Sequence, residues 1–263
     1  MKSNRSFIQW AGLVSFSALI LQPFSEYAQP VPAQAANRPP AGITCQKGPS
    51  GDGNMAICEW QAEWLQWAVS LPADASPFLD NTGQNAGIGQ HGPVWFLAGN
   101  FGGTVHRTNA VPAGKWLFFP ILNQFWIGFR GDPPWHQRFT DPATGTNYRS
   151  YETYVRQAVL KPMMDAATDL LCEIDGKAVR HLEKYRSQSP TFEVWLPKDN
   201  VFGVDNDLYS YGGNVYQPCA DDGIYLMLAP LAPGQHTIHF TAQTGTFALD
   251  VTYYLTVTPG DAR

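Results

Sequence analysis

The histidines and carboxylates in the middle of the chain are the first residues whose types could support chemistry. Those in or beside loop-like segments rich in Gly and Pro are His91, His106, Asp132, His136 and Asp141. Such side chains act as general acids or bases when a partner orients them. His91 and His106 would approach each other if residues 94–107 formed a hairpin. A secreted hydrolase or lyase that uses these groups is therefore one hypothesis.

A pair of carboxylates, Asp205 and Asp207, follows in the stretch VFGVDNDLYSYGG. Loop carboxylates supply the hard oxygen ligands that Ca²⁺ prefers, but the EF-hand frame with its closing Glu is absent here. Capping of a turn by the Asp side chains is the ordinary alternative. No cofactor is predicted, and Ca²⁺ at this pair is the one metal that the sequence suggests.

Aromatic residues outside recognisable strands form the third group. Residues 124–148 have the pattern of an irregular loop with many aromatics, and long loops within a compact domain are often functional. The candidate ligand-binding side chains are Trp126, Trp135, Tyr209 and Tyr211. Aromatic rings that carry a polar tip suit the faces of sugars. The leading hypothesis is binding of a carbohydrate or cell-envelope component, which requires exposed rings, and a structural or interaction module is a further alternative.

A literal G-x-G-x-x-G match at Gly87, Gly89 and Gly92 lies in NAGIGQHGPVWFLAG. A dinucleotide fingerprint must follow a strand and open a helix whose N-terminus faces the pyrophosphate. Here the glycines follow the loop DNTGQNA and lead through Pro93 into the apolar run VWFLA. The sequence therefore predicts a loop that enters a buried strand, and not a nucleotide site.

The first 35 residues have the pattern of a signal peptide. A basic start precedes an apolar stretch over residues 7–21, and residues 33–35 (AQA) match a cleavage site. The stretch is too short and too polar to span a bilayer, and no later segment is apolar enough. We expect a secreted or periplasmic protein with a Pro-rich leader over residues 36–43, a single domain over residues 44–263 and no membrane span in the mature chain.

Four cysteines remain after export, so disulfides are expected. Pairing of Cys45 with Cys58, across a turn-rich stretch, would leave Cys172 to pair with Cys219. The sequence alone does not choose among the three pairings that four cysteines allow. A zinc site formed by the cysteines is the alternative to disulfides, but no C-x-x-C or C-x-x-H spacing supports it.

The charge of the chain bears on its partners. The formal net charge is −5, and it becomes slightly more negative once the signal peptide is removed. A mildly acidic chain with few Lys and Arg residues lacks the excess of positive charge that binding to nucleic acid or to anionic lipid requires. Neither class of partner is expected.

The periodicity of the chain predicts a mainly β fold, an antiparallel β-sandwich of jelly-roll or Ig-like type with two helices in the N-terminal half. The first helix covers residues 54–70, and its three tryptophans share one face, as core-facing side chains do. The second helix covers residues 151–160 and is stopped by Pro162.

Strands are predicted from short apolar or alternating runs bounded by turn residues. Residues 94–98 form a buried strand that returns antiparallel over residues 104–107. Pro120 marks an edge or a bulge. Residues 221–223 (DDG) are a turn before a strand, and residues 247–257 alternate as in a strand with one solvated face.

Four phrases, GPVWFLAG, VPAGKWLFFPILN, DGIYLMLAPLAPGQHTIHF and DVTYYLTV, lie between residues 85 and 257. In these phrases the chain resembles a family of exported bacterial proteins of no known activity. The resemblance covers most of that range and implies export and a β-rich fold. It implies no activity, and no functional residue is carried over from it.

Overall fold

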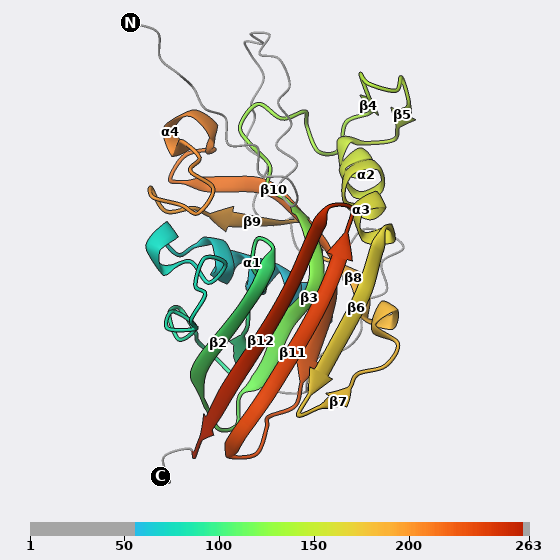
Figure 1. The fold of residues 1–263 in the computed structure, drawn as a ribbon. Coiled ribbons are helices and arrows are strands. Elements are labelled where there is room, and N and C mark those ends of the chain that lie inside the picture. Colours follow the sequence, from blue (N-terminus) through green and yellow to red (C-terminus); the bar gives the residue numbers. More distant parts are fainter. Residues whose placement is uncertain (1–55, 260–263) are drawn as a thin grey trace, which may run out of the picture.

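The computed structural model describes residues 56–259, which form two five-stranded sheets (Figure 1). In sheet 1 the order is β1 (Val94–Phe96), β3 (Trp116–Trp126), β10 (Val215–Leu228) and β8 (Arg186–Gln188), and β9 (Phe192–Trp195) also pairs with β10. In sheet 2 the order is β2 (Gly103–Pro112), β12 (Phe247–Thr258), β11 (Gly234–Thr244), β6 (Ala167–Ile174) and β7 (Lys177–Ala178). The mainly β fold expected from the sequence is confirmed.

Both sheets are mixed, and the prediction of purely antiparallel sheets is wrong. The pairs β1–β3 and β2–β12 are parallel, and the other pairs are antiparallel. The hairpin expected over residues 94–107 does not form, because the segment after β1 carries the chain into sheet 2 instead of turning it back. His91 and His106 are therefore not brought together by a hairpin.

A single apolar core lies between the two sheets. Leu117, Phe119 and Ile121 of β3 enter it from sheet 1, and residues such as Phe240 of β11 and Val251 of β12 enter it from sheet 2. The rings of Phe119 and Phe240 meet across it, with centroids 5.4 Å apart. Alternation along β12 follows the predicted pattern, because a strand shows its side chains to opposite faces in turn.

Pro120 lies at a register shift in the β3–β10 ladder, so the predicted bulge is confirmed. The edge alternative also fits, because β1 pairs only with residues 116–118 of β3, and the part of β3 after Phe118 is paired with β10 alone. The expected turn over residues 221–223 is wrong. These residues lie within β10, a continuous strand that begins at residue 215.

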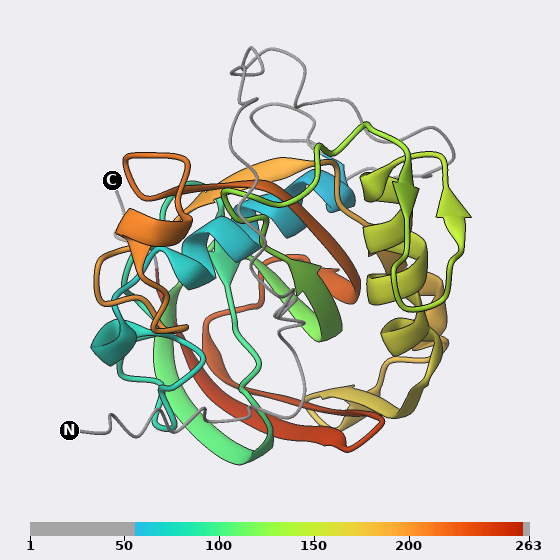
Figure 2. The same ribbon diagram turned by 90° about the horizontal axis from the view of Figure 1, so that it is seen from above.

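Helix α1 (Ile57–Val69) packs on the face of sheet 1 that points away from sheet 2 (Figure 2). Trp64 and Trp67 are buried, and their indole N–H groups donate to the carbonyls of Leu97 (2.9 Å) and Ile88 (2.9 Å). The tryptophan stripe therefore fixes the helix to the core, which confirms the core-facing interpretation of the pattern.

The second helical segment is longer than predicted. It runs through α2 (Tyr151–Tyr154), the π-helical turn η3 (Val155–Leu160) and α3 (Lys161–Asp165), with Pro162 in the first turn of α3. Pro162 lies where the π-helical turn passes into α3, and π-helical turns interrupt the i→i−4 ladder to which Pro cannot donate. The helix continues through Pro162, so the prediction that it stops there is wrong. The other short elements are η2 (Ala73–Ala75), β4 (Phe139–Thr140), β5 (Asn147–Tyr148), η4 (Leu182–Tyr185) and α4 (Asn206–Tyr209).

Cys172 and Cys219 are free buried thiols, so their predicted disulfide is wrong. Cys172 lies in the core between the sheets, whereas Cys219 lies in the core between sheet 1 and α1, which separates the two side chains. Burial raises the pKa of each thiol to about 12, which makes both unreactive. Cys45 lies outside the described residues, as do the predicted signal peptide and leader, and its pairing with Cys58 stays a prediction.

The glycine-rich stretch before β1 is a loop that enters a buried strand, as predicted, and most of its residues are exposed. Gly89 has a φ of +69°, and a Cβ there would lie 3.2 Å from the indole of Trp67. The side chain of Gln90 accepts from the N–H of Phe96 (2.9 Å) and donates to its carbonyl (2.8 Å). The loop therefore anchors α1 and the end of β1 to one another.

The buried guanidinium of Arg107 joins three segments near the start of sheet 2. Its Nε donates to the carbonyl of Asp80 (2.6 Å), and its Nη atoms donate to the carbonyls of Ala98 and Gly99 and to the hydroxyl of Tyr253 (2.7 Å). The side chain is 1% exposed. It supplies donors to buried carbonyls, of which that of Ala98 also accepts from the hydroxyl of Tyr253 (2.8 Å).

Replacing Arg107 with Met is expected to destabilise the protein by about 3 kcal/mol, because buried acceptors lose their donors. Urea unfolding of the protein measures the loss. The exposed Arg138, changed to Met, is the matched control and should stay within about 0.5 kcal/mol of the parent. Equal midpoints for the two variants would contradict the role given to Arg107.

Candidate functional site

The residues around 130 are held against the segment that contains α4. The backbone N–H of Arg130 donates to the carbonyl of Tyr209 (2.8 Å), and its Nη2 donates to the carbonyls of Asp207 (3.0 Å) and Leu208 (2.8 Å). The hydroxyl of Tyr211 donates to the carbonyl of Phe129 (3.1 Å). Arg130 thus fixes the relative position of two loops.

This junction exposes aromatic rings. Tyr209 and Tyr211 are each 42% exposed, and Leu208 beside them is 58% exposed. The ring of Phe129 meets those of Tyr209 and of the buried Tyr216 edge to face, each at 5.6 Å, and so packs against Tyr209. Two of the four predicted ligand-binding aromatics are therefore accessible on a fixed surface.

Asp132 lies beside these rings as a half-buried carboxyl group. Its Oδ2 accepts from the N–H of Phe129 (2.9 Å), and burial raises its pKa to about 6 despite that bond. Burial, together with the charge of Asp132, raises the pKa of Tyr211 to about 12 and also raises that of Tyr151. The carboxyl therefore stands close to two phenols and can exchange a proton near neutral pH. We call Asp132, Tyr209 and Tyr211 the tyrosine surface.

Trp126 and Trp135, the other two predicted ligand-binding aromatics, are buried. Only 3% and 7% of their surfaces are exposed. Their rings meet that of Tyr151 edge to face, each at 6.1 Å, and the Trp135 indole donates to the hydroxyl of Thr191 (3.1 Å). Both side chains belong to the buried cluster around Tyr151 and present no ring face to a ligand.

The three candidate histidines do not form one site. His91 is exposed and contacts a backbone carbonyl two residues earlier. His106 lies on β2 and stacks on Tyr254 at 6.3 Å. His136 is exposed, with Nδ1 3.8 Å from a carboxylate oxygen of Glu152. Each has a different neighbour, so no shared acid–base pair of histidines is formed.

The remaining candidate carboxylates accept hydrogen bonds from nearby residues of their own turns. Asp141 accepts from the N–H of Ala143 (3.0 Å) and from the hydroxyl of Thr144 (2.7 Å). Asp205 is the N-cap of α4 and accepts from the N–H of Asp207 (2.9 Å), as the turn-capping alternative expects. Within residues 56–259 no group of three or more His, Cys, Asp or Glu side chains could hold a metal ion. Calcium binding at this pair stays a prediction.

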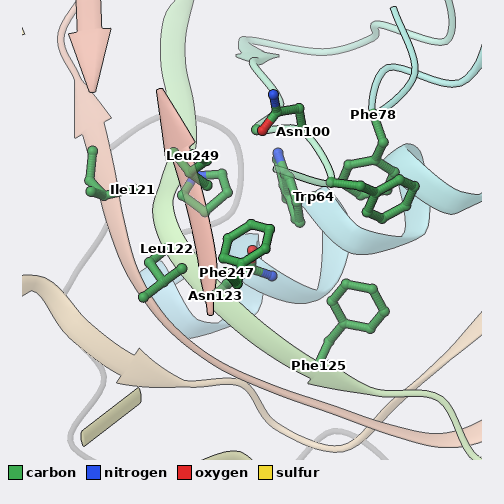
Figure 3. Close-up of a pocket in the computed structure, with 12 residues that line it drawn as sticks. Trp64, Phe78, Asn100, Ile121, Leu122, Asn123, Phe125, Phe247 and Leu249 are labelled. Atoms are coloured by element: carbon green, nitrogen blue, oxygen red, sulfur yellow. The ribbon is translucent and has the colours of Figure 1, made fainter. Parts of the chain in front are cut away.

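A small pocket opens between α1, β3 and the start of β12 (Figure 3). Aromatic rings line it, among them Trp64, Phe78 and Phe247, together with the amides of Asn100 and Asn123. Its free space is about 20 Å³, enough for one water molecule and too little for a sugar. The pocket is therefore a packing feature next to the polar group described below.

Behind Asn123 lies a carboxyl group that the sequence analysis missed. Asp221 is fully buried, and its Oδ2 accepts from Nδ2 of Asn123 (2.7 Å) and from the hydroxyl of Tyr225 (3.1 Å). Burial raises its pKa to about 8, although both bonds and the charge of Arg156 oppose the shift. The group holds its proton at neutral pH.

The next residue, Asp222, is equally buried but is fully paired. Arg186 donates from Nε and Nη2 to its two oxygens, each at 2.8 Å, and Gln188 donates to Oδ2 (2.9 Å). Consecutive residues of a strand point to opposite faces, so the two carboxyls meet different environments. Their adjacency in the sequence resembled a turn and gave no signal of this difference.

Comparisons with protein-family models, with curated proteins and with solved structures find no match for this chain. The family resemblance noted from the sequence therefore stays a prediction. In the part of the chain that the structure describes, no helix has the length and apolarity needed to cross a membrane.

The protonated Asp221 makes stability depend on pH. Its carboxyl ionises near 3.8 in the unfolded chain and near 8 in the folded chain. Between these values the folded state holds one more proton, so the contribution of this group to stability is full below pH 4 and is lost as pH rises towards 8. Asp221→Asn is expected to flatten the pH dependence by up to about 1.4 kcal/mol per pH unit.

Urea unfolding at a series of pH values between 5 and 8 measures this effect, and Asp199→Asn on the exposed surface is the control. The control should keep the slope of the parent. If the stability of Asp221→Asn changes with pH in parallel with that of the parent, Asp221 does not keep its proton in the folded protein.

Proposed function

We propose that the protein binds a carbohydrate or another cell-envelope component at the tyrosine surface. The observation that carries the proposal is the exposure of Tyr209 and Tyr211 beside the carboxyl of Asp132. Tyrosine rings pack against the apolar faces of sugar rings, and their hydroxyls bond to sugar hydroxyls. A carboxyl group with a free oxygen accepts hydrogen bonds from further hydroxyls.

The stiffness of the surface supports the same proposal. Arg130 joins the two loops through three hydrogen bonds, and Phe129 supports the tyrosine rings. A surface that is already ordered loses little conformational entropy when a ligand binds. Two facing sheets with a shared core support a sandwich scaffold beneath it, and the signal-peptide pattern supports a secreted or periplasmic location.

A hydrolase or lyase is the second candidate, and Asp132 is the residue that favours it. A carboxyl group with a pKa of about 6 can act as an acid or a base near neutral pH. Glu152 is engaged by Arg156 at 2.9 Å, so it is not free to form a carboxylate pair with Asp132.

If the chain is an enzyme, the mature protein releases new reducing ends from the oligosaccharide that it binds, and Asp132→Asn lowers that rate at least about 100-fold. Recovery of the bound oligosaccharide intact after long incubation would contradict the enzymatic candidate and leave the binding proposal standing.

Binding is tested with the mature chain on an array of neutral, amino and acidic oligosaccharides, followed by titration with the best binder. Tyr209→Ala and Tyr211→Ala should each weaken binding about tenfold, because each removes a stacking face. Tyr254→Ala is the matched control, since Tyr254 is 45% exposed on sheet 2 and far from the surface in sequence.

The control variant should bind as the parent does. An equal loss for all three variants, or none for Tyr209 and Tyr211, would contradict the assignment of the surface. Failure of the mature chain to bind any oligosaccharide would contradict the proposed function and favour an interaction module.

A further inference from the structure

Three buried oxygen atoms near the middle of sheet 1 have no hydrogen-bond partner within residues 56–259. They are Oε1 of Gln61, Oγ of Ser187 and Oδ1 of Asp221. Gln61 and Asp221 are 0% exposed. A buried polar atom without a partner costs about 1–3 kcal/mol, so three in one region require an explanation.

The strand register puts Ser187 and Asp221 on one face of the sheet. Ser187 is paired with Gly223 in the β8–β10 ladder, and directly opposed residues show their side chains to the same face. Asp221 is two residues from Gly223 on β10, and it therefore shares that face as well. Between them, the backbone of Gly223 is covered by Asn123 and Tyr225, which a Cβ at this position would approach to 2.6 Å.

Gln61 reaches the same place from α1. Its Nε2 donates to the backbone carbonyl of Ser187 (3.0 Å), which fixes the orientation of the amide and places Oε1 within the same region. On Asp221, Oδ2 is held from the β3 side by Asn123 at 2.7 Å. The second oxygen, Oδ1, is left on the other side of the carboxyl group, where β8 is the next strand.

We propose that Gln61, Ser187 and Asp221 together bind one internal water molecule that links α1 to sheet 1. Because Asp221 keeps its proton and its Oδ2 already accepts two bonds, Oδ1 carries the O–H. The set therefore contains one acceptor, Oε1 of Gln61, and two hydroxyl groups that can donate. A water molecule donates to Oε1 and accepts from both hydroxyl groups, and three bonds are typical for a buried water. A calcium ion needs six to eight oxygen ligands, which this set does not supply.

A crystal structure of the mature chain at about 1.5 Å resolution tests the site. The expected result is one ordered solvent peak about 2.7–3.2 Å from each of the three oxygens. The absence of a peak, direct bonding among the three side chains, or a peak with five or more oxygens at about 2.4 Å, as for a cation, would each overturn the proposal.

A double-mutant cycle gives a test in solution. Gln61→Met and Ser187→Ala each remove a partner of the same water, so each should raise the unfolding equilibrium constant about tenfold and the double variant by clearly less than the product of the two effects. The bond from Gln61 to the Ser187 backbone carbonyl is lost equally in both backgrounds and cancels.

Gln66 is the matched control on the same helix, because its Nε2 donates to the carbonyl of Glu193 (3.1 Å) from an exposed position. Gln66→Met combined with Ser187→Ala should be additive. Additive effects for the Gln61 cycle, about a hundredfold in the double variant, would overturn the proposal.

Discussion

The buried guanidinium of Arg107 is the contact on which the arrangement of the two sheets depends. Its donors meet the carbonyls of Asp80, Ala98 and Gly99, so it binds the loop before β1 and the crossing from β1 to β2. The hydroxyl of Tyr253 joins the same group from β12. No carboxylate pairs with this charge in the part of the chain that the structure describes, and backbone dipoles provide its solvation instead. Because the crossing is fixed in this way, β2 pairs parallel with β12 and the two sheets enclose one core.

Sheet 1 carries polar groups on both sides of β10. Asp222 is paired with Arg186, whereas Asp221 keeps its proton between Asn123 and Tyr225. Burial of a charge is tolerated only where donors surround it, and within residues 56–259 Asp221 has no cationic partner of the kind that Arg186 gives to Asp222. The same strand runs from this polar centre to residue 215, near the loops of the tyrosine surface. The scaffold and the proposed binding site therefore share β10.

Local sequence patterns predicted the elements that are determined by the spacing of nearby side chains. The tryptophan spacing gave the buried face of α1, and the alternation over residues 247–257 gave β12. The parallel partner of β2 was not predictable, because it lies more than 130 residues away and no local signal specifies it. Residue type also did not separate Trp126, which is buried, from Tyr211, which is exposed. Exposure and desolvation arise from tertiary packing, so the candidate site was only half identified in advance.

An NMR titration of the mature chain with its strongest-binding oligosaccharide tests ligand binding at the tyrosine surface most directly. The ring signals of Tyr209 and Tyr211 should shift with the oligosaccharide concentration, and the indole N–H signals of the buried Trp126 and Trp135 should keep their positions. Shifts at Tyr254 without shifts at Tyr209 and Tyr211 would place the ligand on sheet 2 and contradict binding at the tyrosine surface.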